Sequence, residues 1–336
     1  MTCRRSSLVL LATALVVTSL VACGGRQQSA TPAPGGAGCE ITANNRIAVA
    51  TGNTGGVYYV LGGAFAEAVS AATGGRLKAT AAETGASVQN IQQVVAGNYQ
   101  VAFSLADTAA DAVNGAGSFG GSPQPIRALA RLYPNFSQVV VRADADVSTL
   151  ADLRGKRVST GSPKSGTEVI ANRMLRATGL NPDTDLAAQR LDIGTSVDGM
   201  KDGTIDAMFF SGGLPTPNIT DLFTSLGDQV RLLDTSAVLG PLQEINPVYD
   251  VATIPASTYP DATDTPTIVV PNLLVVPENL DQATACVLTK TLFERKADLV
   301  TVNPAAEDIA LRQARQTDPV PLHPGATQAL DTLGAP

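Results

Sequence analysis

The feature that most constrains the fold is a regular alternation of short apolar segments with helical segments. Loops rich in glycine and hydroxyl side chains separate them, as in the turn over 51–56. In the first part of the chain, strands are expected over 46–50, 77–81 and 99–105, and helices over 57–72 and 88–95, the second with Ser87 as N-cap. Strands alternating with helices of this length predict an α/β fold with a mostly parallel sheet.

The same alternation restarts in the second half of the chain. Two apolar segments, 126–133 and 137–141, precede a strand–loop–helix unit over 151–178. A late strand over 268–276 lacks a helix of its own, and helices are expected over 280–301 and 304–315. The expected parts are therefore a signal peptide over 1–22, a flexible tether over 23–44, a first lobe over 45–136, a second lobe over 137–267, and a return to the first lobe over 268–336 with C-terminal helices.

The N-terminus predicts export and attachment to a membrane. Residues 1–22 combine a charged start with the apolar stretch 8–17, which is the layout of a secretory signal and too short to span a bilayer. The stretch ends in LVACGG, which resembles the lipobox of bacterial lipoproteins with Cys23 as the lipidated residue. The alternative is a cysteine without lipid. We expect a protein on the outer face of the cell membrane, held there by its lipid anchor alone.

The cysteines predict one disulfide. Cys3 is removed with the signal and Cys23 is acylated, which leaves Cys39 and Cys286 as a pair in an oxidising compartment. Such a bridge would stabilise the fold by roughly 5 kcal/mol in the chain-entropy treatment. Two buried free thiols are the alternative.

Composition excludes several classes of function. The formal charge is -7, and no cluster of lysine and arginine follows residue 5, so nucleic acid is not a partner. The single histidine, His323, leaves no visible base for a nucleophile and no Cys/His zinc site. The glycine frame at 161–167 lacks the lysine that a nucleotide-binding loop requires. We expect no catalytic residue, no metal and no cofactor, and hence a protein that is not an enzyme.

The loop 161–167 predicts an anion site instead. It offers small residues, hydroxyls and backbone N–H groups at a helix N-terminus, which favour a carboxylate. An ordinary serine or threonine helix cap is the alternative. Because the loop 51–56 has the same character in the first half, we expect a ligand in a cleft between lobes that close on it.

Seven segments of the chain carry a resemblance to one family. They are TGNTGGVYYVLGGAFAE (51–67), ETGASVQNIQ (83–92), RLYPNFSQVVV (131–141), DLRGKRVSTGSPKSGTE (152–168), DGTIDAMFFSGGLP (202–215), IPASTYP (254–260) and PLHPGA (321–326). In this order, over about residues 45–326, they resemble the solute receptors of the TAXI branch of TRAP transporters. The resemblance implies a two-lobed periplasmic-binding-protein fold of type II. It also implies a monomer that delivers a small organic acid or acidic amino acid to an ion-coupled membrane permease.

The resemblance also implies a set of ligand-binding residues. These are Thr54, Gly55, Gly56, Tyr58, Ser87, Asn90, Ser104, Ser165, Gly166, Thr167, Ser211 and Gly212. Local helix capping is the alternative for each hydroxyl, and a core aromatic is the alternative for Tyr58. Arg131 and Lys164 are candidates to meet the ligand's charge, or else surface residues. The family often has a glutamine before Asp107, where this chain has Leu105-Ala106.

That departure leaves the identity of the carboxylate open. Glutamate-like and dicarboxylate ligands fit the resemblance best. Two other functions remain as alternatives: a lipoprotein sensor that presents its ligand to a membrane receptor kinase, and a secreted hydrolase, which would need a nucleophile and base that the sequence does not display.

Overall fold

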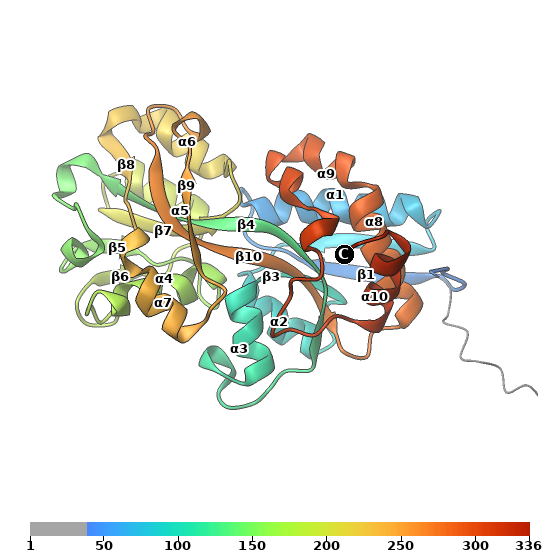
Figure 1. Cartoon of the computed structure of the whole chain (residues 1–336). Coiled ribbons are helices and arrows are strands. Elements are labelled where there is room, and N and C mark those ends of the chain that lie inside the picture. The colour runs from blue at the N-terminus through green and yellow to red at the C-terminus, as the bar shows by residue number, and fades with distance from the viewer. Residues whose placement is uncertain (1–38) are drawn as a thin grey trace, which may run out of the picture. The chain divides into compact units, whose positions relative to one another are not determined.

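Two long strands, β4 (Ile126–Arg142) and β10 (Thr265–Pro277), connect the two halves of one sheet, as Figure 1 shows. The computed structural model describes residues 39–336, which belong to one compact unit. The expected signal peptide, Cys23 and the tether up to residue 38 lie outside the described residues. No helix within the described residues is long and apolar enough to cross a membrane.

The first half of the sheet is built from the N-terminal strands. Its order is β2-β1-β3-β10-β4, with β1, β2 and β3 parallel and β10 antiparallel to both β3 and β4. The elements here are β1 (Asn45–Ala50), α1 (Val57–Ala72), β2 (Leu77–Ala82), α2 (Ser87–Val95), β3 (Val101–Leu105) and α3 (Ala106–Asn114). The parallel strands carry the predicted α/β pattern, and the helix over 57–72 is confirmed.

The second half continues the sheet beyond β4 in the order β7-β5-β6. Strand β8 pairs with the end of β4, and β9 pairs with the start of β10. The elements are β5 (Arg157–Ser159), α4 (Gly166–Ala177), β6 (Ala187–Gln189), α5 (Ile193–Lys201), β7 (Ala207–Gly212), α6 (Pro217–Leu226), β8 (Val230–Leu232), α7 (Leu239–Ile245) and β9 (Asp250–Ile254). The second α/β unit expected from the sequence is therefore present.

The C-terminal helices belong to the first half: α8 (Gln282–Glu294) and α9 (Lys296–Val302) pack beside α1 (Figure 1). Helix α10 (Pro324–Thr332) packs on α8. The helix predicted over 304–315 is wrong, because the chain there forms two short 3-10 turns. The part of the expected tether that the structure describes, 39–44, contacts the body: Ile41 is buried, and a disulfide joins Cys39 to Cys286 in α8.

The apolar segments 126–133 and 137–141 form the single strand β4, not two. Proline normally breaks a ladder because it has no N–H to donate. Here Pro134 faces Pro271 of β10, and the register shifts directly after that pair. The Asn272 side chain compensates, because its Nδ2 donates to the Tyr133 carbonyl at 2.9 Å. The lobe boundaries expected after 136 and 267 fall inside these two crossing strands.

Candidate functional site

A small cavity lies between the two halves of the sheet, at the loops that open several helices. Its volume is about 40 Å³, which is room for a compact group. The residues that line it are Gly52, Asn53, Gly56, Val57, Tyr58, Ala86, Ser87, Leu105 and Asn135 from one side, and Gly161, Ser162, Ser165, Gly166, Thr167, Leu191, Ile193, Ser196, Phe209, Phe210, Ser211 and Gly212 from the other. None of these lining residues is charged.

Five helices begin at this cavity. Residues at the N-termini of α1, α2, α3, α4 and α5 all line it. Each helix N-terminus carries a partial positive charge of about half an elementary charge, from N–H groups that have no acceptor inside the helix. The cavity is therefore suited to an anion, although no basic side chain lines it.

Three of the five helices begin without a side-chain cap. The N-cap residues of α1, α2 and α3 are Gly56, Ala86 and Leu105, and none of them makes a side-chain capping hydrogen bond. The expectation that Ser87 caps α2 is wrong: Ser87 is the first helical residue, and its Oγ accepts a hydrogen bond from the Leu105 N–H at 3.1 Å. Ala86 has φ of 75°, a conformation that costs an alanine energy and is often found at binding sites.

The second half contributes hydrogen-bond donors that have no acceptor among the described residues. The Ser211 Oγ is buried and has no partner among the described residues, and the whole residue is 8% exposed. The Ser211 N–H donates to the Thr167 Oγ1 at 3.1 Å, which places both hydroxyls beside the start of α4. Ser165 caps α4 by accepting from the Glu168 N–H at 2.9 Å. Gly166 and Thr167, the first two residues of α4, line the cavity, and their N–H groups have no intrahelical acceptor.

Tyr58 connects the cavity to the crossing strands. Its hydroxyl donates to the Oδ1 of Asn272 in β10, and the Asn272 Nδ2 donates to the Asn135 Oδ1 of β4 at 2.7 Å. The Asn135 Nδ2 in turn donates to the Ser211 carbonyl at 3.3 Å. Burial raises the pKa of the Tyr58 phenol well above its ordinary value, so it acts as a neutral donor.

The structure brings together eight of the twelve ligand-binding residues expected from the sequence. Those that line the cavity are Gly56, Tyr58, Ser87, Ser165, Gly166, Thr167, Ser211 and Gly212. Thr54, Gly55, Asn90 and Ser104 do not line it. The Asn90 Nδ2 instead donates to the Thr51 and Phe103 carbonyls at 2.7 and 2.9 Å, and the Ser104 Oγ donates to the Leu105 carbonyl at 3.0 Å. Thr54 is exposed, and Gly55 packs against Asn218.

The two basic candidates lie elsewhere. Arg131 donates from Nη1 to the Gln316 Oε1 at 3.1 Å and lines a separate groove, and Lys164 donates from Nζ to the Gln92 Oε1 at 3.3 Å.

The sequence did not predict the apolar wall of the cavity. Its members are Val57, Leu105, Leu191, Ile193, Phe209 and Phe210. The sequence indicated a buried strand that ends in Phe209-Phe210, but the spacing of its residues did not show which side chain would reach the cavity.

Direct contacts close the cleft over the cavity. The Ser162 Oγ of the second half donates to the Asn53 Oδ1 of the first at 2.8 Å, and the Gln89 N–H donates to the Lys164 carbonyl at 3.1 Å. Gly166 lies so close to the first half that an added Cβ would be 2.6 Å from the Ser87 Oγ. These contacts describe a closed arrangement of the two halves.

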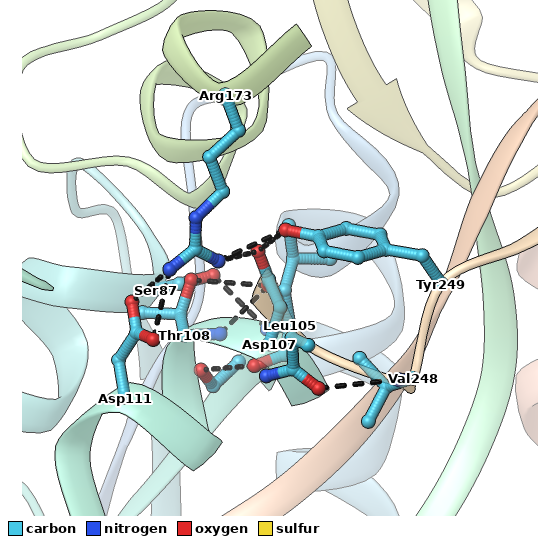
Figure 2. A network of polar contacts seen from close by, with 10 residues as sticks. Ser87, Leu105, Asp107, Thr108, Asp111, Arg173, Val248 and Tyr249 are labelled. Atoms are coloured by element: carbon cyan, nitrogen blue, oxygen red, sulfur yellow. Dashed lines mark hydrogen bonds and ion pairs between the residues drawn. The ribbon is translucent and has the colours of Figure 1, made fainter. Parts of the chain in front are cut away.

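A buried ion network beside the cavity also joins the halves (Figure 2). Arg173 of α4 donates from Nη1 to the Asp107 Oδ2 at 2.9 Å and from Nη2 to the Asp111 Oδ2 at 2.6 Å, both in α3. The Tyr249 hydroxyl accepts from the same Nη1 at 2.9 Å and donates to the Asp107 Oδ2 at 2.5 Å. The Arg173 side chain is 12% exposed and that of Asp107 0%, so solvent screens the network little.

Burial alone would lower the pKa of Arg173, but the neighbouring carboxylates outweigh it and raise the pKa. Burial also raises the pKa of Asp111, against the opposing effect of Arg173. The guanidinium therefore stays charged and is shared by two carboxylates. Among the described residues, no group of acidic, histidine and cysteine side chains is arranged to hold a metal ion.

Comparison with known proteins identifies the family. A sequence model of the NMT1-like family matches residues 49–334. The chain belongs to the NMT1-like family.

Solved structures give the fold of this NMT1-like protein. A binding-protein component of an ABC phosphonate transporter from Pseudomonas aeruginosa superposes with a TM-score of 0.54 at 12% identity, over 79% of this chain and 80% of that one. A protein from Bordetella bronchiseptica RB50 gives a TM-score of 0.53 at 19% identity, over 85% and 88%. The two-lobed α/β periplasmic-binding-protein fold expected from the sequence is confirmed.

Proposed function

We propose that this NMT1-like protein is an extracytoplasmic solute-binding receptor, and not an enzyme, that captures a small carboxylate and passes it to a membrane transporter. The observation that carries the proposal is the convergence of five helix N-termini on a cavity with no charged lining residue. Three of these helices lack side-chain caps, so a bound anion would supply the missing acceptors.

The carboxylate would sit at the start of α4. Gly166, Thr167 and Ser211 all line the cavity there, and the Ser211 N–H donates to the Thr167 Oγ1, so the donors of these residues are available to one small anion. A buried hydroxyl without a partner, as in Ser211, is costly unless a ligand or water satisfies it. The phosphonate-transporter component with the same fold is named for another small oxyanion, so phosphonates and sulfonates belong in the test.

The transporter partner and the membrane anchor rest on the sequence. The TAXI resemblance over residues 45–326 favours an ion-coupled TRAP permease, and the lipobox at Cys23 favours a lipid-anchored protein. We also propose a lobe over 45–136 and 268–336 and a second lobe over 137–267. A sensor that presents its ligand to a receptor kinase is the alternative, and a fused permease gene beside this one would favour transport.

The proposal is tested by a thermal-shift screen followed by calorimetry on the mature chain. The panel contains glutamate, glutamine, 2-oxoglutarate, C4-dicarboxylates, short monocarboxylates, phosphonates and sulfonates. We expect at least one acid to bind, and Ser211→Ala to weaken it by about 10- to 100-fold, because hydrogen bonds to charged groups contribute about 1.5–3 kcal/mol.

Ser104→Ala is the matched control, since Ser104 is also buried and was expected at the site but does not line the cavity. It should leave the affinity unchanged. The proposal fails if no small anion binds, or if Ser104→Ala weakens binding as much as Ser211→Ala does.

A further inference from the structure

We propose that this protein has a second binding site, a groove behind the crossing strands that takes a small zwitterion, a molecule with both a carboxylate and an ammonium. The groove has a volume of about 580 Å³, which is typical of sites for small molecules. It shares no lining residue with the cavity between the halves. The site itself does not rest on the proposed function, which concerns that cavity alone.

The groove and the cavity are formed by the same two backbone segments. In β4, Pro134 lines the groove and the next residue, Asn135, lines the cavity. Successive residues of a strand point to opposite faces, so β4 separates the two sites. At the start of α3, Leu105 lines the cavity and Ala106 lines the groove. A molecule in the groove therefore contacts segments that also form the cavity.

The groove also joins the two halves of the sheet. Arg131 comes from the part of β4 in the first half, and Tyr249 directly precedes β9 in the second half. The Tyr249 hydroxyl accepts from the Arg173 Nη1 at 2.9 Å and donates to the Asp107 Oδ2 at 2.5 Å (Figure 2). One residue of the groove thus belongs to the ion network between α3 and α4. A molecule that contacts both halves stabilises the arrangement in which they meet.

Arg131 supplies a cation that has no carboxylate partner. Its side chain is half-buried, and its Nη1 donates to the neutral Gln316 Oε1 at 3.1 Å. It forms no ion pair with any residue that the structure describes. A guanidinium has five N–H donors in a fork that matches a carboxylate, so four are left for a ligand or water. Burial lowers the pKa of Arg131, and a ligand carboxylate would offset this cost.

Asp250 and Asp318 supply the opposite charge. Both line the groove and are exposed, and neither forms an ion pair within the described part of the chain. The charge of Asp250 partly opposes the effect of burial on the pKa of Arg131, so these two groups act on each other. Arg315 also lines the groove, but its guanidinium is paired with Asp331. The unpaired charges are one cation and two anions, which complement a ligand that carries both signs.

The groove also contains an apolar surface beside these charges. Its members are Pro134, Val248, Val269, Val270 and Pro271. Pro134 and Pro271 face each other in the ladder between β4 and β10. Such a surface suits a small apolar side chain. The zwitterion that fits the groove is therefore a small amino acid with an apolar side chain.

Calorimetry on the mature chain and on Arg131→Gln tests the site. The probes are valine, leucine and proline, each with its amide, which lacks the carboxylate, and its N-acetyl form, which lacks the ammonium. We expect at least one amino acid to bind, and Arg131→Gln to weaken it at least about tenfold, because hydrogen bonds between charged groups are lost. The amide should bind at least about tenfold more weakly than the amino acid. Any binding of the N-acetyl form should be equal in both proteins.

Two further variants complete the test. Asp250→Asn should also weaken the amino acid, since it removes a partner of the ammonium. Arg127→Gln is the matched control, because Arg127 lies in the same strand but is paired with Glu278 and does not line the groove. It should leave the affinity for the amino acid unchanged. The thermal unfolding of each variant is measured beside the affinity to show that it folds.

A consequence for the cavity is tested with an acid that binds there, and this consequence alone rests on the proposed function. Because a groove ligand favours the closed arrangement, we expect it to raise the affinity for that acid about fivefold or more in the wild type. Arg131→Gln should remove this increase. An unchanged affinity for the acid would show that the groove is not coupled to closure.

The outcomes separate the groove site from the function of the cavity. The site is wrong if none of the three amino acids binds, or if Arg131→Gln weakens binding no more than Arg127→Gln does. A site that binds the N-acetyl form as tightly, and through Arg131, would take an anion and not a zwitterion, which would overturn the proposal. If an amino acid binds through Arg131 but no acid binds in the cavity, the proposed function fails and the groove site stands.

Discussion

Replacing Arg173 with methionine tests whether the ion network between α3 and α4 stabilises the closed molecule. The substitution keeps most of the side-chain length and removes the cation that Asp107 and Asp111 share. Both carboxylates are nearly buried, at 0% and 10% side-chain exposure, so neither can be solvated in place. Removing one partner of a buried ion pair typically costs about 3–5 kcal/mol. We expect the free energy of unfolding in urea at pH 7 to fall by about that amount.

The loss should shrink as the pH falls. Burial already raises the pKa of Asp111, and removing Arg173 removes the charge that opposes this rise. A carboxyl with a raised pKa in the folded state contributes stability at low pH and loses it as the pH rises through that pKa. The difference between wild type and Arg173→Met is therefore largest near neutral pH. Adding Asp111→Asn to Arg173→Met should recover part of the loss at pH 7.

Arg190→Met is the matched control. It removes the ion pair with Glu168, in which the arginine side chain is 56% exposed, and exposed pairs contribute at most about 1 kcal/mol. The reasoning is refuted if Arg173→Met costs no more than Arg190→Met, or if its cost does not depend on pH.

Three further predictions concern other parts of the described chain. Ala86→Gly should raise the free energy of unfolding by about 1 kcal/mol, because Ala86 has φ of 75°; a lower value in urea unfolding would contradict this. Burial lowers the pKa of His323, whose Nδ1 accepts from the Gly325 N–H at 3.1 Å. Its contribution to stability is therefore present above pH 6.5 and lost as the pH falls through the lower folded pKa, and His323→Asn should abolish that step in unfolding measured from pH 7.5 to 5. Intact-mass analysis after native alkylation should show no reactive thiol at Cys39 or Cys286, and two alkylated thiols would exclude the disulfide.

Local patterns were sufficient to predict most of the fold. The glycine and hydroxyl turn at 51–56 and the apolar helix after it depend on neighbouring residues, and the helix bounds agree with α1. The continuity of β4 through Pro134 was not predictable, because it depends on Pro271 and Asn272, which lie far away in the sequence. The helix expected over 304–315 was also wrong, because the chain there forms two short 3-10 turns.

The part of the candidate site that lies on loops before helices was predictable from the sequence. The loop at 161–167 indicated a helix N-terminus with free N–H groups, and Ser165, Gly166 and Thr167 do line the cavity. The sequence did not show which of two buried serines would line the cavity. Ser211 lines it, whereas the Ser104 Oγ donates to the carbonyl of the next residue, Leu105. The convergence of five helices is a property of the sheet's strand order, and no local pattern contains it.

A crystal structure with a bound small acid tests the central claim most directly. We predict a carboxylate between the halves, with its oxygens within about 3.2 Å of the Ser211 Oγ and of the N–H groups that begin α4. A carboxylate bound instead at Arg131, in the separate groove, would contradict the account, as would an acid whose carboxylate faces Phe209 and Phe210.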